Sequence, residues 1–420
     1  MPSNNSLPRS HSMGDRETIA MMALVMALQA LAVDAMLPAL GFIADDLGVT
    51  DPNRRQLVIG TFLLASGFAS LLPGSLADRF GRRPVLLSCI GIYILFSLGC
   101  ALVTSFDGLL VMRVLQAMGC GGLAVLPGAI IRDRFSGDQM AKQMSIISVV
   151  FLVVPMLAPS IGQVVLLFAG WRWIFVFLAV MAVVMALWVY MRLPETLHPE
   201  YRQPIRLGAI AVNMAGAATN RSAIGYVLGG SLTFGAMLGY INCSQQLVAE
   251  HFGAGETFPL LFGFSALMMA AANFSNSRIV ERFGARRVSH TAVFAFIAVS
   301  ATQLWFATRP GETLWQFMPL MILNMILIGF IGANFNSIAL QPFASTAGSA
   351  NSMHAFLRMV IGSVIGIFVG QAYDGSARPL ALALLICGVV SLLLVLYSEK
   401  GKLFRRIHPP GTPRPIVLEH

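Results

Sequence analysis

Charged side chains are scarce in this sequence: Asp, Glu, Lys and Arg together make up 11% of its 420 residues. A typical globular domain is about 25% charged, so this composition excludes an ordinary water-soluble protein. Hydrophobic residues form 56% of the chain and gather in runs of about 18 residues or more, which predict transmembrane helices. We expect twelve spans, at 18–42, 56–77, 84–104, 108–131, 142–168, 171–192, 223–248, 257–280, 287–308, 314–340, 349–372 and 378–398.

Cysteine is also rare, and the five cysteines stand singly within apolar runs. Their spacing indicates small buried hydrophobic residues and neither disulfides nor metal ligands. The sequence shows no metal cluster, nucleophile–base pair or phosphate-binding loop, so we expect neither an enzyme nor a bound cofactor. The glycines of Gly119-Cys120-Gly121-Gly122 lie inside a predicted span, where small residues let helices pack closely.

The net charge of +9 could suggest a nucleic-acid partner, but the positions of the basic residues favour a membrane topology. With both termini in the cytoplasm, the cytoplasmic segments hold 21 of the 28 Lys and Arg residues and the outer loops hold 5. The remaining two, Arg113 and Arg358, fall inside spans. This asymmetry follows the positive-inside rule. We therefore expect cytoplasmic termini and no nucleic acid.

The chain contains an internal repeat. Asp78-Arg79-Phe80-Gly81 ends the second span of the first half, and Glu281-Arg282-Phe283-Gly284 ends the second span of the second half. Such an echo is typical of transporters built from two parallel repeats. We expect an all-α integral membrane protein with twelve transmembrane helices in two six-helix bundles. Its parts would be a first bundle at 1–192, a cytoplasmic linker at 193–222, a second bundle at 223–400 and a cytoplasmic tail at 401–420.

A short polar stretch, 74–83, joins the second and third spans in the pattern Gly-x-x-x-Asp-Arg-x-Gly-Arg-Arg. Gly74 would let two helices approach closely, and Gly81 would supply a positive φ in a tight turn. Asp78 would cap or face the N-terminus of an adjacent helix. This combination indicates a hinge, although an ordinary basic loop would fit the charges. The basic residues that would hold it at the cytoplasmic surface are Arg79, Arg82 and Arg83.

Asp34 is the only one of the 19 acidic residues that lies well inside a predicted span. A charge at that depth costs about 2.5–3.5 kcal/mol on insertion scales, so such residues are usually functional. Burial disfavours the charged form of a carboxylate, which suits reversible protonation. Pro38 follows and is expected to kink or loosen the helix. We expect Asp34 to carry a coupling proton; the alternative is a permanent ion pair with Arg113 or Arg358.

The two arginines within spans have several possible roles. Arg113 keeps its proton and so is not the carrier; it could influence a neighbouring carboxylate, bind carbonyls across a helix gap, or snorkel to the outer surface. Arg358, with His354 one turn before it, could attract polar or anionic substrate groups, or could offset Asp34. His354 alone is more typical of a hydrogen-bonded core histidine than of a proton relay.

Two further features suggest a gate and a pocket. Pro159 and Gly162 give the fifth span a bent, small-residue face, which is either a simple kink or a pliable gate. Amides and a phenol among Met and Phe residues would make an adaptable pocket, although hydrogen bonds between helices explain them nearly as well. These polar candidates are Tyr240, Asn242 and Asn334.

Further motifs accompany the loop at 74–83 along nearly the whole chain: Asp34-Ala35-Met36-Leu37-Pro38-Ala39-Leu40, Arg113-x-x-Gln116, Ile131-Arg132-Asp133, Leu157-Ala158-Pro159, Trp171-Arg172-Trp173-Ile174-Phe175, Pro194-Glu195-Thr196-Leu197, Asn276-Ser277-Arg278 and Ala347-Gly348-Ser349-Ala350. Together they resemble the drug:proton antiporters of the major facilitator superfamily, and within them the bicyclomycin and chloramphenicol resistance (Bcr/CflA) subfamily. The resemblance implies a two-bundle transporter of the bacterial inner membrane that rocks around a central site, driven by the proton gradient. By family analogy it would be a monomer.

The resemblance also implies roles for particular residues. Asp34 matches the membrane-embedded acid for which proton and drug compete, and Arg113 matches an arginine tied to proton coupling. Asp78 matches a loop acid that stabilises the outward-facing state, with Arg132 or Arg134 as its partner. The expected gating residues are Gly74, Asp78, Arg79, Gly81, Arg82, Arg83, Arg132, Pro159 and Gly162. The expected substrate contacts are Asp34, Met36, Tyr240, Asn242, Asn334, His354 and Arg358.

The function expected from these residues is proton-coupled efflux of small amphipathic antibiotics such as chloramphenicol or bicyclomycin. One alternative is the export of a normal metabolite, such as an amino acid or short peptide. A membrane receptor is a second alternative, but no soluble signalling domain is evident in the sequence. The expected partners are a small molecule, protons and the lipid bilayer.

Overall fold

The computed structural model describes residues 13–135, 137–197, 200, 216 and 219–405, and every regular element among them is helical. Ten of these helices are long and apolar enough to cross a bilayer, and Arg54–Ala69 with Leu71–Phe80 forms one further span, bent by 40°. The remaining helix, α7 (Gly137–Phe168), has a shorter apolar part over Val153–Phe168. The predicted all-α class and twelve spans are confirmed. Most of the predicted linker (193–222) and tail (401–420) lies outside the described residues.

The chain divides into two compact units, each described here by itself. One unit comprises Met1–Thr50 and Thr61–Arg206, and the other comprises Asp51–Gly60 and Leu207–His420. The division expected from the sequence places residues 51–60 in the first bundle, whereas their contacts group them with the second unit. Helix α3 (Leu57–Ala69) begins in that segment and continues into the first unit.

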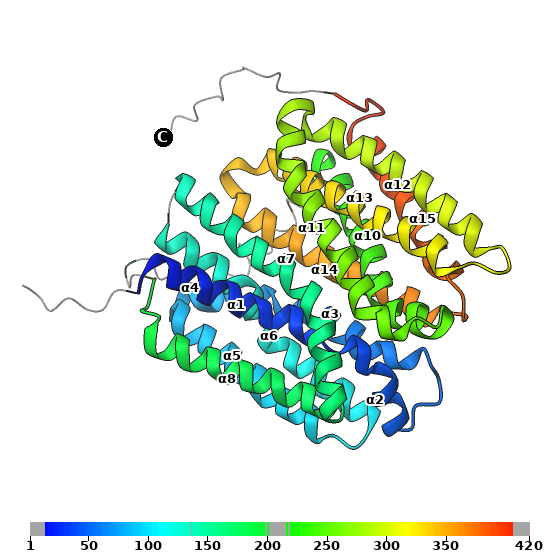
Figure 1. The fold of residues 1–420 in the computed structure, drawn as a ribbon. Coiled ribbons are helices and arrows are strands. Elements are labelled where there is room, and N and C mark those ends of the chain that lie inside the picture. Colours follow the sequence, from blue (N-terminus) through cyan, green and yellow to red (C-terminus); the bar gives the residue numbers. More distant parts are fainter. Residues whose placement is uncertain (1–12, 136, 198–199, 201–215, 217–218, 406–420) are drawn as a thin grey trace, which may run out of the picture. The chain divides into compact units, whose positions relative to one another are not determined.

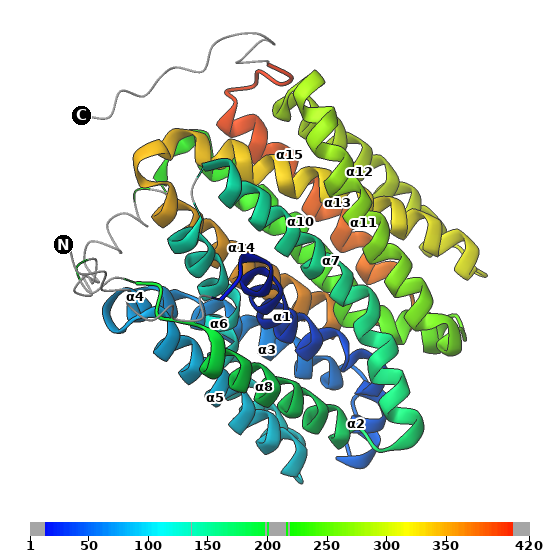
Figure 2. The same cartoon turned by 60° about the vertical axis from the view of Figure 1, so that its left-hand side comes forward.

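In the first unit, α5 packs against both α6 and α8, and α1 packs against α6 and α7 (Figure 1 and Figure 2). Five buried cysteines in the two units carry free thiols, as expected. The elements of this unit are α1 (Asp15–Asp34), η1 (Leu37–Ala39), α2 (Leu40–Asp46), α4 (Leu71–Phe80), α5 (Arg82–Leu102), α6 (Phe106–Arg134), α7 and α8 (Arg172–Arg192).

The first transmembrane helix is interrupted, as Pro38 predicts. Helix α1 ends at Asp34, and the 3-10 turn η1 carries Pro38 before α2 begins at Leu40. Proline removes a backbone donor and disfavours a helical conformation in the residue before it. The break therefore places Asp34 at the end of a helix, next to backbone that no longer follows a regular ladder.

Small residues let α5 and α6 pack with their backbones almost in contact. A Cβ on Gly119 would lie 2.5 Å from the carbonyl oxygen of Cys89 and 2.7 Å from the amide nitrogen of Tyr93. A Cβ on Gly121 would lie 2.5 Å from the backbone of Ala69, in α3. The role predicted for this glycine cluster, close helix packing in the bilayer, is confirmed.

In the second unit, α10 packs against α13, α14 and α15, and α12 packs against α13 and α15 (Figure 1). This pattern of neighbours repeats that of α1, α5, α6, α7 and α8 in the first unit. The elements are η2 (Arg54–Gln56), α10 (Arg221–Gln245), η4 (Gln246–His251), η5 (Gly255–Thr257), α11 (Phe258–Phe283), α12 (Ala285–Ala307), α13 (Leu314–Leu340), η6 (Gln341–Thr346), α14 (Ala347–Gln371) and α15 (Arg378–Ser398).

Polar contacts explain why residues 51–60 belong to this unit. The Asn53 amide donates to the carbonyl oxygens of Gln371, at 3.1 Å, and Tyr373, at 2.7 Å. The Arg55 guanidinium binds both carboxylate oxygens of Glu250 at 2.5 and 2.6 Å. The Arg55–Glu250 contact is charge-assisted, and such hydrogen bonds are stronger than neutral ones.

Replacing Gly119 by Ala tests the close packing of α5 and α6. The added methyl group would meet the backbone of α5, so the helices must move apart, and we expect a loss of about 1–3 kcal/mol of stability. Thermal melting of the purified protein in detergent measures this loss. Gly91→Ala, on α5, is the matched control because a Cβ there meets nothing within 4 Å. Equal melting temperatures for the two variants would contradict the packing argument.

Candidate functional site

Asp34 is 5% exposed and lies where α1 breaks. Among the residues that the structure describes, none forms a hydrogen bond or ion pair with its carboxylate. Helix α7 comes very close to the same break: a Cβ on Gly162 would lie 2.1 Å from the carbonyl oxygen of Ala35 and 3.2 Å from Cγ of Pro38. Apolar surroundings make the charged form of an isolated acid costly. Asp34 is therefore suited to gain and lose a proton.

Arg113 does not neutralise Asp34. Its side chain is fully buried on α6, and its guanidinium donates to Oε1 of Gln116 at 2.8 Å and to the carbonyl oxygen of Ala32 at 3.0 Å. The guanidinium carbon also lies 4.0 Å from the centre of the Phe62 ring. The ion-pair alternative with Asp34 and the snorkelling alternative are therefore both wrong for Arg113, and binding of a carbonyl across a helix gap is confirmed.

The hydrogen bonds of Arg113 continue into a buried chain of polar groups. Nε2 of Gln116 donates to Oγ of Ser97 at 2.6 Å, and Ser97 donates to the carbonyl oxygen of Tyr93 at 2.6 Å. The Tyr93 hydroxyl donates to the carbonyl oxygen of Leu28, on α1, at 3.2 Å. This chain fixes the backbone of α1 just before Asp34, so Arg113 positions the acid without pairing with it.

The loop at 74–83 differs in part from the prediction. Gly81 has φ 104°, as expected for a residue that needs a left-handed conformation. A Cβ on Gly74 would meet only Val125, at an ordinary 3.8 Å, so the close approach expected at Gly74 is not found within its unit. Arg79 is exposed, with its guanidinium 5.3 Å from the Phe80 ring. Arg83 donates to the carbonyl oxygen of Tyr190.

Asp78 does not pair with Arg132 or Arg134. It accepts from Nη1 of Arg82, one helical turn later, at 2.6 Å. Arg82 also donates from Nε to Asp133 at 2.9 Å, whereas Arg132 is exposed. Arg134 instead binds the start of α1, because it donates to Oγ1 of Thr18 at 2.6 Å and to the carbonyl oxygen of Met13 at 2.8 Å. Arg132 and Arg134 flank Asp133 in the sequence, and it is Asp133 that joins α6 to α5 through Arg82.

Glu195, not Asp78, caps the helix that follows the loop. Its carboxylate accepts from the backbone amides of Arg82, at 2.8 Å, and Arg83, at 3.2 Å, at the start of α5. A Cβ on Gly81 would lie 2.5 Å from this carboxylate, so glycine is needed there for space as well as for φ. A carboxylate at a helix N-terminus satisfies free N–H groups and opposes the helix dipole. Glu195, which follows α8, thus connects the end of the sixth helix to the loop at 74–83.

The second unit has a related arrangement, in which the acid binds the side chain of the arginine and not backbone amides. Gly284 has φ 85°, and Arg286 donates to Glu399, which follows α15, at 2.7 Å. The Tyr226 hydroxyl donates to the same carboxylate at 2.6 Å. Although partial burial of Glu399 acts in the opposite direction, these hydrogen bonds hold the pKa of Glu399 below its usual value. The internal repeat therefore extends to an acid after the sixth helix of each half.

The expected substrate contacts do not all lie together. Asn334 is bound to Asn276, with Nδ2 of Asn334 2.8 Å from Oδ1 of Asn276, so a hydrogen bond between α13 and α11 accounts for it. Its neighbour Phe335 contacts Gly229 and Gly230, near the start of α10. Asn242 lies at least twelve residues further along α10, a rise of about 18 Å, and these two amides cannot line one small pocket.

The other candidates in the second unit gather along α10 and α14. The Tyr240 ring is buried and stacks on Phe262, with ring centres 6.1 Å apart. Asn242 donates to the carbonyl oxygen of Leu238 and faces Gly366 of α14. The Arg358 guanidinium lies 5.3 Å from the centre of the Phe234 ring.

His354 is buried on α14, and neither ring nitrogen has a hydrogen-bond partner among the described residues. The hydrogen-bonded core histidine expected here is therefore not found. In the first unit, the remaining candidates Met36 and Pro159 are both buried, Met36 beside the break in α1 and Pro159 within α7.

The paired six-helix repeats, with ionisable groups inside the spans, define the architecture of a secondary transporter. The family model of the Major Facilitator Superfamily matches residues 22–367, and the chain belongs to this superfamily.

Two curated relatives extend over almost the whole chain. A bicyclomycin resistance protein homolog of Haemophilus influenzae is 29% identical over 392 residues, covering 92% of this chain and 97% of that protein. The multidrug resistance protein MdtL of Klebsiella pneumoniae (strain 342) is 30% identical over 388 residues, covering 91% and 95%.

Solved structures show the same fold. The xylose transporter XylE from E. coli superposes with a TM-score of 0.67 at 14% identity, covering 91% of this chain and 99% of that one. The human organic anion transporter MFSD10 gives a TM-score of 0.67 at 18% identity, with the same coverage. At this level of identity the likeness concerns the fold alone.

Neighbouring residues 132 and 133 offer a matched test of the loop network. Asp133→Ala removes the acceptor of Arg82, and we expect a loss of about 1.5–3 kcal/mol because that hydrogen bond is charge-assisted and partly buried. Arg132→Ala, at the exposed neighbouring position, should leave the melting temperature within about 1 °C of the wild type, since exposed substitutions change stability little. A larger effect at Arg132 than at Asp133 would contradict the observed pairing.

Proposed function

We propose that this protein is a proton-coupled exporter of small amphipathic drugs, and that Asp34 is the residue at which proton and drug exclude each other. The observation that carries the proposal is the buried, unpaired Asp34 carboxylate at the break in α1. The names of the two relatives, which concern bicyclomycin and multidrug resistance, support drugs as the substrate class. Coupling requires that proton and substrate be linked through one site.

The cycle follows from the chemistry of one acid. Asp34 takes a proton from the outer side, the drug leaves, and the two bundles reorient. Loss of the proton on the inner side restores the charged carboxylate and readmits drug. Arg113 holds α1 in position during this cycle, and the proton gradient supplies the driving force without a cofactor.

Other residues have proposed roles in the reorientation and in binding. The loop 74–83, with Arg132, forms a hinge region, and Pro159 and Gly162 let α7 move against the break in α1. Met36 lies beside Asp34 in the chain and is a proposed drug contact. In the second unit, His354 is a candidate because neither of its ring nitrogens has a hydrogen-bond partner among the described residues. Arg358 is a further candidate, and its guanidinium lies beside the Phe234 ring. Tyr240 and Asn242 are candidates as well, because the Tyr240 hydroxyl and Oδ1 of Asn242 also lack partners among the described residues. Asn334 is the weakest candidate because it is hydrogen-bonded to Asn276.

The proposed setting is the bacterial inner membrane, with both termini in the cytoplasm and the protein acting as a monomer. The excess of Lys and Arg in alternate loops supports this orientation. The basic residues at the start of α5, and those at the start of α12, would then face the cytoplasm.

Transport of chloramphenicol into or out of proteoliposomes under an imposed proton gradient tests the proposal. We expect gradient-driven flux in the wild type and a fall to the level of protein-free vesicles in Asp34→Asn, because the amide cannot carry the proton. Asp45→Asn removes an exposed acid from α2 and is the matched control, which should retain wild-type flux.

The other outcomes are also informative. Equal gradient-driven flux in the wild type and in Asp34→Asn would contradict coupling at Asp34. If neither protein transports chloramphenicol or bicyclomycin, but the wild type exports a toxic amino acid or peptide analogue, the metabolite-export alternative replaces drug efflux.

A further inference from the structure

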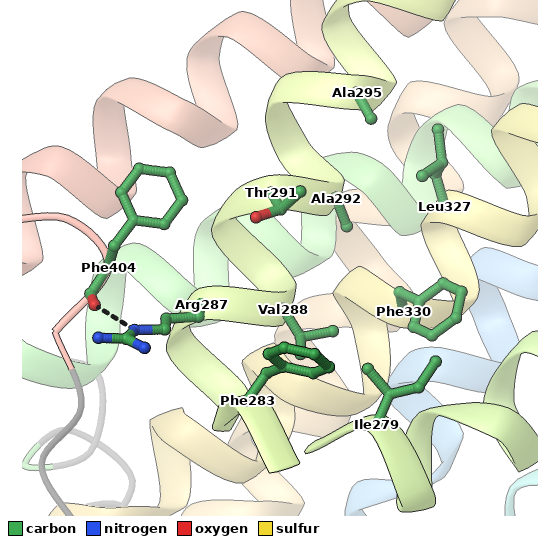
Figure 3. A pocket seen from close by; sticks show the side chains of 10 residues that line it. All are labelled: Ile279, Phe283, Arg287, Val288, Thr291, Ala292, Ala295, Leu327, Phe330 and Phe404. Atoms are coloured by element: carbon green, nitrogen blue, oxygen red, sulfur yellow. Dashed lines mark hydrogen bonds between the residues drawn. The ribbon is translucent and has the colours of Figure 1, made fainter.

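An apolar groove opens between α11 and α12 in the second unit, with α13 as its floor (Figure 3). Helices α11 and α12 both pack on α13 but touch each other little, which leaves about 680 Å³ between them. The residues that form its walls and floor include Ile279 and Phe283 from α11, Ala292 and Ala295 from α12, and Leu327 and Phe330 from α13.

One end of the groove is positively charged. Arg287 lines it, and the Arg282 guanidinium lies 5.4 Å from the centre of the Phe283 ring, itself a wall of the groove. Both arginines are exposed, and neither has an ion-pair partner among the described residues. Arg286, between them in sequence, is instead neutralised by Glu399 at 2.7 Å.

The segment after α15 holds Arg287 in place. Nε of Arg287 donates to the carbonyl oxygen of Phe404 at 3.1 Å, which leaves its terminal nitrogens directed away from that bond (Figure 3). Phe404 has φ 61°, which is unusual for a bulky residue. Its amide donates to Nδ1 of His290 at 3.0 Å, and its ring stacks on Phe294. These contacts keep Phe404 as a fixed side wall of the groove.

We propose that this groove binds an anionic phospholipid, with the phosphate at Arg282 and Arg287 and an acyl chain between α11 and α12. The two arginines flank the turn at Gly284, where the spans end, and Ala295 lies about 12 Å further along α12. The groove thus runs from the membrane surface into the hydrocarbon layer, the direction of a lipid chain. Water is a poor occupant because the walls offer few polar partners.

Charge complementarity selects the headgroup. Basic sites between transmembrane helices at the cytoplasmic surface attract anionic lipids, with each arginine contributing about fivefold in affinity. A zwitterionic lipid with the same chains would fill the apolar part but gain less from the two arginines.

Native mass spectrometry of the delipidated, full-length protein tests the site by titration with phosphatidylglycerol and, in parallel, phosphatidylcholine. We expect the wild type to bind phosphatidylglycerol more tightly. The double variant Arg282→Gln and Arg287→Gln should weaken that binding by about 25-fold, at about fivefold for each arginine, and leave phosphatidylcholine unchanged. Arg309→Gln is the matched control, since Arg309 is exposed and lies over Trp305 at the opposite end of α12.

A second variant tests the apolar part of the groove. Ala295→Phe should fill the deep end and weaken the binding of both lipids, with an unchanged melting temperature showing that the protein is still folded. Equal affinity for the two lipids in the wild type, or an unchanged phosphatidylglycerol affinity in the double arginine variant, would overturn the proposal. If chloramphenicol binds in the groove and phosphatidylglycerol does not, the groove is a substrate site instead.

Discussion

The hydrocarbon core of a bilayer offers no water to hydrogen-bond a polar side chain, and this constraint shapes both halves of the protein. Several buried polar groups in the described parts of the spans are satisfied by other helices. Asn324 joins Ser300 and Gln303 between α13 and α12, and Arg113 binds a carbonyl of α1. An ionisable group inside a span that lacks such a partner destabilises the fold, so its presence there indicates a functional role. Among the described residues, Asp34 meets this criterion because no hydrogen bond or ion pair forms with its buried carboxylate, and so do His354 and the Tyr240 hydroxyl.

The break in α1 shows how the sequence produces such a site. Pro38 prevents the helix from continuing, Gly162 lets α7 approach the buried backbone at the break, and Arg113 fixes the turn before the acid. Each of these residues supports the position of Asp34 without neutralising it. The same three devices, proline, glycine and a buried arginine, would be costly in a helix that served only to span the membrane.

The two halves also share a device at their basic ends. A glycine with positive φ starts the third helix of each half, an arginine follows it, and an acid after the sixth helix binds there. In the first half Asp133 and Asp78 share Arg82, whereas in the second half Tyr226 joins Arg286 at Glu399. The two networks lie at equivalent places in the two halves but differ in geometry, because Glu195 accepts from backbone amides whereas Glu399 accepts from the Arg286 side chain.

Much of this could be predicted from the sequence, because hydrophobic length, charge asymmetry and glycine conformation are local properties. The twelve spans, the positive φ of Gly81 and the isolation of Asp34 in an apolar run all depend on near neighbours in the chain. The roles of Glu195 and Asp133 could not be predicted, since they depend on which helices meet. The pairing of Asn334 with Asn276 and the clustering of residues 51–60 with the second unit likewise join distant segments.

The most direct test of the central claim asks whether drug and proton exclude each other at Asp34. Chloramphenicol would be added to the purified protein in weakly buffered detergent solution while released protons and bound drug are both measured. The account predicts that binding releases protons from the wild type, and that Asp34→Asn, whose neutral amide mimics the protonated acid, binds drug more weakly and releases none. Drug binding without proton release in the wild type, or undiminished release from Asp34→Asn, would contradict it.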